Sequence, residues 1–327
     1  MQEPNILITG AAGYIGSHVA KLLSKKNFNT ILLDDLSTGH KGAAKYGVFY
    51  EGSTGNQSLV EKIIQEHKIS TVMHFAGSAI VEESIQNPLA YYSNNTANTI
   101  SLLMALQKTN VKYFIFSSTC AVYGTPAIVP IPEECEHNPI NHYGQSKSFI
   151  EKILNDLTKQ AGLCSAVLRY FNAAGADPDG ALGENHTPET HLIPRVLQAC
   201  LTPNSKLTIY GGDYKTRDGT CIRDYIHVED LAWAHLKAVH LLWDKNSFFD
   251  FNLGSEKGAS VLEIIEATQK ITGLKVPYAI GPRRIGDPPV LIAQSQKAKN
   301  LLGWKPQHDI PSIIKTAFDW EKTAKTI

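Results

Sequence analysis

The chain has no excess of charge of either sign, because 31 lysines and arginines balance 31 aspartates and glutamates in its 327 residues. It contains no block of basic residues, which argues against binding to nucleic acid or to an anionic membrane surface. No apolar run is long enough to span a bilayer, and the first residues, Met1 to Pro4, lack the basic segment of a signal peptide. We therefore expect a cytoplasmic protein without a nucleic-acid or membrane partner.

Cysteine is also scarce. The five cysteines are odd in number and scattered along the chain, at Cys120, Cys135, Cys164, Cys200 and Cys221. No two form a Cys-x-x-Cys pair, and no histidines join them in a zinc-binding pattern. The sequence thus predicts free thiols in a reducing compartment and no metal site.

What the chain does contain is an alternation of short apolar strands and amphipathic helices through its first half. The expected strands cover residues 5–9, 30–33, 48–50, 71–75, 112–116 and 164–168. A long helix is expected from Pro88, with Ile100, Leu103 and Met104 on its inner face. Such alternation predicts an α/β fold with a doubly wound, parallel, Rossmann-type sheet.

The composition changes after Arg169, where glycine, proline and aspartate become frequent and the hydrophobic periodicity is lost. We expect a smaller C-terminal α/β substrate-binding lobe to begin here. The predicted NAD-binding domain covers 1–171, with 222–252 returning to it. The predicted lobe covers 172–221 and 253–327.

The first strand ends in the glycine-rich turn Gly10-Ala11-Ala12-Gly13-Tyr14-Ile15-Gly16, and a helical pattern follows. In this context the glycines let the backbone approach a pyrophosphate, and the helix N-terminus attracts its charge. Asp34, at the end of the second strand, is placed to bind ribose hydroxyls and to repel a 2′-phosphate, which favours NAD over NADP. Phe75 to Gly77 and Thr119 also follow strands, so these segments are expected to meet at one edge of the sheet.

Tyr143 and Lys147 are four residues apart, so a helix would put both side chains on one face. An ammonium beside a phenol favours the phenolate, and the tyrosine could then act as a base near neutral pH. The spacing alone is weak, because it also occurs in helices with a half-buried tyrosine and a solvated lysine.

Together these segments resemble the extended short-chain dehydrogenase/reductases and, within them, the UDP-glucose 4-epimerases. The likeness extends over nearly the whole chain. The segments that carry it are 9–18, 74–77, 116–124, 143–147, 168–172, 219–228 and 283–287, of which the last three are the most specific to the epimerases.

The resemblance implies an enzyme that interconverts UDP-galactose and UDP-glucose, serving galactose metabolism. The sugar is oxidised transiently at C4 by tightly bound NAD, and the 4-keto sugar turns over before it is reduced again. The implied catalytic residues are Tyr143, Lys147 and Thr119. The implied NAD-binding residues are Gly10, Gly13, Tyr14, Ile15, Gly16, Asp34, Phe75, Ala76, Gly77, Asn94, Lys147 and Tyr170. The implied UDP-sugar ligands are Thr119, Tyr143, Phe171, Asn172, His191, Leu192, Arg223, Arg284 and Leu291. The family is commonly dimeric, which points to a homodimer through helices near 89–108 and 144–161.

Three positions depart from the family pattern. Gly52-Ser53-Thr54-Gly55 replaces a segment whose aspartate contacts adenine in many members, and Ala79 replaces a lysine that many members carry. Both put the tightness of NAD binding in question. Leu291, at a position associated with the size of the accepted sugar, leaves open whether 2-acetamido sugars fit.

Other functions remain open at this point. The chain could epimerise another UDP-sugar, such as UDP-GlcNAc, UDP-GalNAc or UDP-glucuronate, or it could be a non-catalytic NAD-binding regulator. A 4,6-dehydratase is disfavoured, because Cys120-Ala121 follow Thr119 where that reaction needs an acid/base pair.

Overall fold

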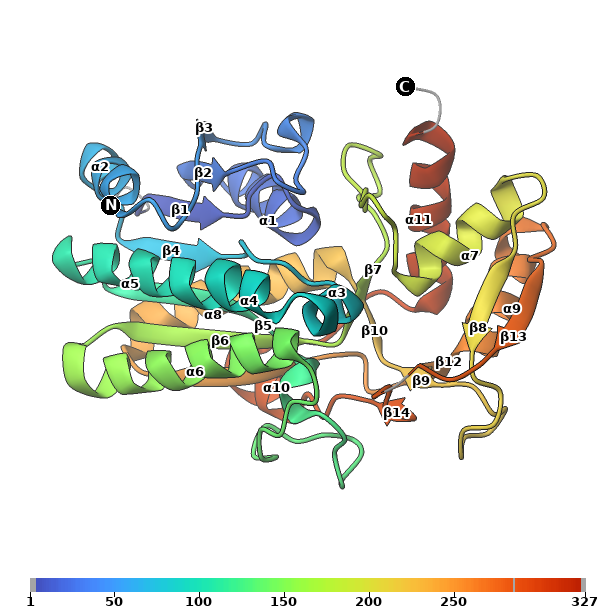
Figure 1. Ribbon diagram of the computed structural model, residues 1–327. Helices are drawn as coiled ribbons and strands as arrows, with labels where there is room; N and C mark the ends of the chain where they lie inside the picture. The colour runs from blue at the N-terminus through green and yellow to red at the C-terminus, as the bar shows by residue number, and fades with distance from the viewer. Residues whose placement is uncertain (1–3, 285, 325–327) are drawn as a thin grey trace.

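The computed structural model describes residues 4–284 and 286–324 (Figure 1). Its centre is a seven-stranded sheet in the order β11-β6-β5-β4-β1-β2-β3, with every neighbouring pair parallel. The strands are β1 (Ile6–Thr9), β2 (Thr30–Asp34), β3 (Val48–Glu51), β4 (Thr71–His74), β5 (Tyr113–Thr119), β6 (Cys164–Tyr170) and β11 (Phe249–Leu253). The predicted doubly wound parallel fold is therefore confirmed.

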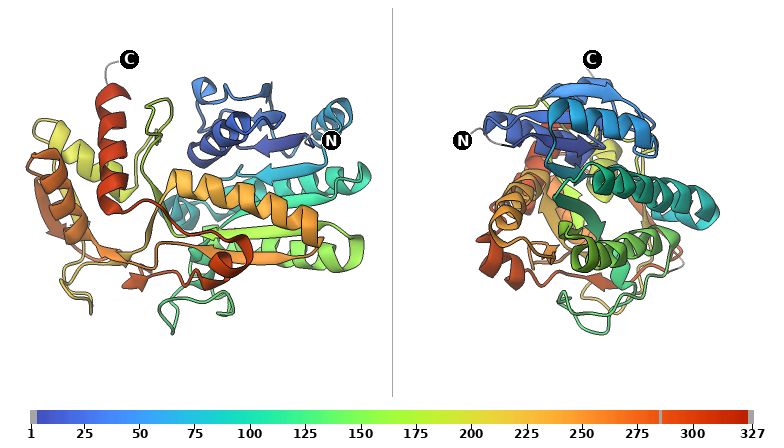
Figure 2. Two further views of the ribbon diagram at one scale, coloured as in Figure 1. Left: turned by 180° about the vertical axis from the view of Figure 1, so that it is seen from behind. Right: turned by 90° about the vertical axis from the view of Figure 1, so that its left-hand side faces the viewer.

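Helices cover both faces of this sheet, as the end-on view in Figure 2 shows. One layer contains α1 (Tyr14–Lys25) and α8 (Val228–Lys245), and the other contains α2 (Gln57–His67), α5 (Asn98–Lys108) and α6 (His142–Ala161). Successive strand residues point to opposite faces, so Ile6 and Ile8 pack into one apolar core while Leu7 packs into the other. Burial on both faces explains why these strands are apolar at nearly every position.

Short elements connect these layers. They are η1 (Lys41–Ala43), α3 (Val81–Gln86), α4 (Pro88–Tyr91), the π-helical η2 (Tyr92–Ala97) and η3 (Cys120–Tyr123). The long helix expected from Pro88 is thus divided into three segments, α4, η2 and α5.

The expected inner face of this helix is wrong in part. Leu103 is buried, but Ile100 and Met104 are 38% and 54% exposed, and Leu102 and Leu106 are buried instead. Apolar residues occur on more than one side of α5, so their spacing alone could not identify the side that faces the core.

The remaining elements, apart from the short helix over 296–302, lie beyond the carboxyl ends of the sheet strands, on the right in Figure 1. That short helix packs against α8 and β11 instead. The remaining elements are β7 (Asn172–Ala174), α7 (Leu192–Leu201), β8 (Leu207–Tyr210), β9 (Ile222–Arg223), β10 (Tyr225–His227), β12 (Ala259–Ser260), α9 (Val261–Thr272), β13 (Tyr278–Gly281), β14 (Val290–Leu291), α10 (Gln296–Leu302) and α11 (Ile310–Ala324). Helices α7, α9 and α11 share a separate apolar core around Val196, Ile264 and Ile313. The domain boundaries given above stay a proposal, and residues 285 and 325–327 lie outside the described residues.

None of the described helices has both the length and the apolar character needed to cross a bilayer.

Candidate active site

A cavity of about 430 Å³ lies where the carboxyl ends of the sheet strands meet the smaller elements. The glycine turn, Asp34, Thr119, Tyr143 and Lys147 all line it. Residues far apart in the chain thus converge on one site, as the position of the strand ends predicts.

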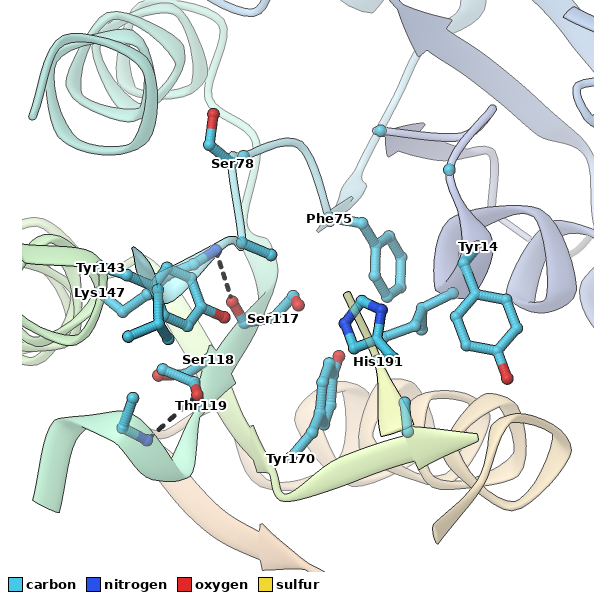
Figure 3. Close-up of a pocket in the computed structure, with 18 of the residues that line it drawn as sticks. Tyr14, Phe75, Ser78, Ser117, Ser118, Thr119, Tyr143, Lys147, Tyr170 and His191 are labelled. Carbon is cyan, nitrogen blue, oxygen red and sulfur yellow. Dashed lines mark hydrogen bonds between the residues drawn. The ribbon is translucent and has the colours of Figure 1, made fainter. Parts of the chain in front are cut away.

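The catalytic pair is positioned by the start of α6. The Asn141 side chain caps this helix by accepting a hydrogen bond from the Gly144 backbone N–H at 2.8 Å. Gly144 packs against the residues that follow β5, where a Cβ atom would overlap the Ala121 carbonyl. The close approach of α6 to this turn brings Tyr143 beside Thr119, at the end of β5 (Figure 3).

Lys147 lies one helical turn beyond Tyr143 and is 4% exposed. Its Nζ donates a hydrogen bond to the Ser117 carbonyl oxygen at 3.0 Å (Figure 3). The same atom lies 4.9 Å from the centre of the Phe116 ring. Burial lowers the pKa of Lys147 to about 8, although the Glu151 carboxylate opposes this shift.

The expected low pKa of Tyr143 is not produced by the protein groups. Burial raises the pKa of Tyr143 to about 12, and the contact with Thr119 offsets only part of that effect. Lys147 directs its ammonium at the Ser117 carbonyl, so its charge does not outweigh the burial of the phenol.

The glycine turn forms the cofactor side of the cavity. Gly10 has a φ of +69°, and a Cβ atom there or at Gly16 would overlap backbone atoms of this turn or of the chain after β4. No side chain caps the N-terminus of α1, which begins at Tyr14 after Gly13. The backbone here can therefore approach a phosphate, whose charge the helix dipole would favour.

Asp34 lies at the end of β2 and is 8% exposed. Its two carboxylate oxygens accept hydrogen bonds from the backbone N–H groups of Ala12, at 2.9 Å, and Leu36, at 2.8 Å. These bonds fix the carboxylate at the cavity wall while leaving lone pairs for ribose hydroxyls. Burial, the largest influence on this carboxyl group, raises its pKa.

Known proteins resemble this chain over nearly its full length. Residues 6–254 match the model of the NAD dependent epimerase/dehydratase family. The chain belongs to this family. The UDP-glucose 4-epimerase of Lactobacillus helveticus is 48% identical over 320 residues, which cover 97% of both chains. The resemblance inferred from the sequence is thereby confirmed.

Solved structures of UDP-glucose 4-epimerases share the fold of this chain. The UDP-glucose 4-epimerase of Brucella ovis in complex with NAD has a TM-score of 0.94 at 46% identity, covering 97% of this chain and 98% of that one. The Bifidobacterium longum UDP-glucose 4-epimerase in complex with NAD+ and UDP has a TM-score of 0.94 at 38% identity, covering 98% and 99%. NAD is the cofactor of this epimerase family, and the glycine turn with Asp34 fits it.

All the predicted NAD-binding residues line the cavity. Of the departures from the family pattern, Ser53 does not line it, and its hydroxyl accepts a hydrogen bond from the Gly55 N–H at 3.1 Å. Its neighbour Thr54 does line the cavity. Ala79 also lines it, and the adjacent Ser78 is held through its backbone by the buried Asn95.

On the opposite side the structure brings most of the predicted substrate ligands together. Phe171, Asn172, His191, Arg223 and Leu291 line the same cavity as Tyr143. The guanidinium of Arg223 is already engaged, since it pairs with Asp287 and donates to the Ile222 carbonyl at 2.9 Å. A diphosphate would have to share or replace the Asp287 contact.

Two predicted substrate ligands lie elsewhere. Leu192 begins α7 and packs against the apolar core of the smaller part, and it does not line the cavity. Arg284 is exposed, and its guanidinium stacks at 4.0 Å on the Tyr210 ring. Neither side chain lines the cavity, because Leu192 packs into that core and the Arg284 guanidinium lies on Tyr210, the last residue of β8.

Several cavity residues were missed by the sequence analysis, notably Ser117, Glu184, His186 and Asp287. Ser117 could have been found, because it precedes Thr119 on the same strand.

His191 is held by two acidic neighbours. Burial opposes its charge, but Glu184 and Glu189 prevail and raise the pKa of His191 to about 10.

Asp34 and the exposed Asp244 offer a matched test of the cofactor site. Replacing Asp34 with alanine should weaken NAD binding about 10- to 100-fold, because a hydrogen bond to a charged group contributes about 1.5–3 kcal/mol. The Asp244 carboxylate on α8 is exposed, pairs with Lys245 and does not line the cavity, so Asp244→Ala should change the affinity far less. Titration calorimetry with NAD measures both variants, and equal losses would contradict the assignment.

Proposed function

We propose that the chain is a UDP-glucose 4-epimerase, which interconverts UDP-glucose and UDP-galactose with NAD held in the cavity. One observation carries this proposal. A single cavity contains the dinucleotide-binding turn, the Tyr143–Lys147 pair with Thr119, and Arg223. It thus joins a cofactor site, an acid/base group and a cation for a diphosphate. Curated UDP-glucose 4-epimerases that are 46–48% identical over 97% of this chain support the choice of reaction.

When bound, NAD would supply reversible oxidation at sugar C4, with no net consumption of electrons. Tyr143 is the group that removes the proton from the 4-hydroxyl and gives it back after the sugar has turned. Thr119, beside the phenol, holds the sugar 4-oxygen. The buried ammonium of Lys147 binds the cofactor ribose. Arg223 binds the diphosphate, so that the oxidised sugar can rotate without leaving the site.

Product analysis tests this proposal. Purified protein is incubated with UDP-galactose, and NMR follows the sugar signals. UDP-glucose without net NADH is expected. A 4-keto-6-deoxy product would indicate a dehydratase instead, and the absence of turnover with intact NAD binding would favour a regulator.

Leu291 is proposed to limit the size of the sugar. It is 8% exposed, lies on β14 and pairs in register with Arg223 on β9, next to the diphosphate ligand. Leu291→Ala should raise kcat/KM for UDP-GlcNAc relative to UDP-glucose, because it removes bulk from the cavity wall. Steady-state assays with both substrates measure the ratio, and an unchanged ratio would refute this role.

We further propose a cytoplasmic homodimer. Leu89, Ile100, Met104 and Phe149 are large apolar residues that remain exposed on α4, α5 and α6, within the two helical regions expected at the interface. A second copy packing on these helices would bury them.

An aspartate at Met104 tests the dimer. Met104→Asp should convert a dimer into a monomer in light scattering at micromolar concentration, because it places a charge in an apolar interface. Ile128→Asp is the control, since Ile128 is 61% exposed in a loop away from these helices. A monomeric wild-type protein would exclude the interface.

A further inference from the structure

The segment between β7 and α7 brings four potential metal ligands together. One nitrogen or oxygen from each of Glu184, His186, Glu189 and His191 lies within 4.8 Å of the other three. The His191 Nδ1 lies 2.6 Å from Glu184 Oε1 and 3.0 Å from Glu189 Oε1. The His186 Nδ1 lies 3.3 Å from the same Glu184 oxygen and 3.9 Å from Glu189 Oε2. Two imidazoles and two carboxylates thus surround one point.

Hydrogen bonds among the described residues leave two atoms of this cluster unsatisfied. Both imidazole Nδ1 atoms approach a single oxygen of Glu184, whose side chain is 5% exposed. Glu184 Oε1 and His186 Nδ1 are buried from solvent, and neither makes a hydrogen bond of acceptable geometry within the described part of the chain. Of the two carboxylates, Glu184 also borders the cavity proposed to hold the diphosphates.

We propose that Glu184, His186, Glu189 and His191 form a binding site for a divalent transition-metal cation, with zinc as the best match. Zinc prefers four ligands in a tetrahedron, at about 2.0–2.2 Å from nitrogen and oxygen, which sets neighbouring ligands about 3.4 Å apart. The four histidine–glutamate distances, from 2.6 to 3.9 Å, lie on either side of that spacing. Imidazole also suits zinc better than it suits magnesium or calcium. A divalent cation would balance the two carboxylates.

The position of the site indicates a structural role. The segment that carries the ligands is held from outside by Trp320 Nε1, which donates to the Glu184 carbonyl at 2.9 Å, and by His40 Nε2, which contacts the Asn185 carbonyl at 3.0 Å. On its inner side, Glu184, His186 and His191 line the cavity. Four protein ligands leave no open position for a substrate. The cation would therefore fasten this segment over the cavity and slow the release of NAD.

Metal content tests the proposal directly. The full chain, with any histidine tag removed, is purified without chelator and analysed by plasma mass spectrometry. Chelator-stripped protein is then titrated with zinc chloride by calorimetry. We expect one zinc ion per chain, a higher melting temperature with zinc, and slower loss of NAD on dialysis.

Variants locate the site. Glu184→Gln and His186→Gln should each weaken zinc binding by about tenfold or more and abolish the stabilisation by zinc. His308→Gln is the matched control, because it removes a ligand from the only other such cluster in the described residues, His227, Glu229 and His308. Circular dichroism checks that each variant folds. X-ray absorption of the wild-type zinc complex gives the ligand set without any mutation.

The absence of stoichiometric divalent metal, or an absorption spectrum without two imidazole ligands, would overturn the site. Zinc binding that persists in the Glu184→Gln/His186→Gln double variant would do the same. None of these results bears on the epimerase assay, which follows the sugar product and so tests the proposed function separately.

Discussion

Tyr143→Phe should lower kcat by about 10²- to 10⁴-fold, the usual contribution of a general acid/base. The phenol is the group that exchanges a proton with the sugar 4-oxygen, and phenylalanine removes only that oxygen. Because the ring remains and the glycine turn and Asp34 are unchanged, the variant should fold and bind NAD like the wild type. The loss should appear in kcat and kcat/KM together, since the missing interaction belongs to the transition state.

Tyr113→Phe is the control for this variant. Tyr113 lies on β5, on the same strand as Thr119, and its hydroxyl donates to the exposed Asn246 side chain at 3.0 Å. Its loss should leave kcat within a factor of about two, because Tyr113 does not line the cavity and a surface substitution of this kind changes the free energy of unfolding by only about 0.5 kcal/mol. Near-wild-type turnover in Tyr143→Phe would remove the proposed base from the mechanism.

Arg169→Met should lower the free energy of unfolding by about 3–5 kcal/mol, the typical cost of leaving a buried charge without its partner. Arg169 and Glu151 are 4% and 3% exposed. The guanidinium donates to Glu151 Oε2 from Nε at 3.0 Å and from a terminal nitrogen at 2.7 Å. It also donates to the Tyr123 hydroxyl at 2.7 Å and to the Glu133 carbonyl at 3.2 Å.

The same pair supports the catalytic elements. Glu151 accepts a hydrogen bond from Ser118, the neighbour of Thr119, and lies one turn beyond Lys147 on α6. Arg169→Met should therefore also lower kcat. Urea unfolding measures the stability of this variant against Lys315→Met, which breaks the exposed pair of Lys315 with Asp319 and should cost less than about 1 kcal/mol. Similar losses of unfolding free energy in both variants would show that the buried pair stabilises the protein no more than the exposed pair does.

The sequence predicted the parallel sheet and the edge at which the site forms, because strand ends and glycine turns are local signals. It did not identify the buried side of α5, since apolar residues occur on more than one side of that helix. It also placed Arg284 at the substrate by resemblance, whereas the structure stacks its guanidinium on Tyr210. The pKa of Tyr143 could not be foreseen from its spacing to Lys147, because burial, which is a tertiary property, dominates it.

The cluster around Glu184 shows the same limit. Its four residues lie in a segment without helical or strand periodicity. The alternation of acid and histidine at 184, 186, 189 and 191 therefore did not show that these side chains lie close together. Only the path of the chain between β7 and α7 brings the four side chains to one point.

The most direct measurement of the central claim uses UDP-galactose labelled with deuterium at C4. The purified protein, with NAD bound, is incubated with this substrate, and NMR and mass spectrometry locate the label in the product. If C4 is oxidised and reduced again within one cavity, UDP-glucose should form with the deuterium still at C4. Loss of the label to solvent, or its transfer to another carbon, would contradict the account.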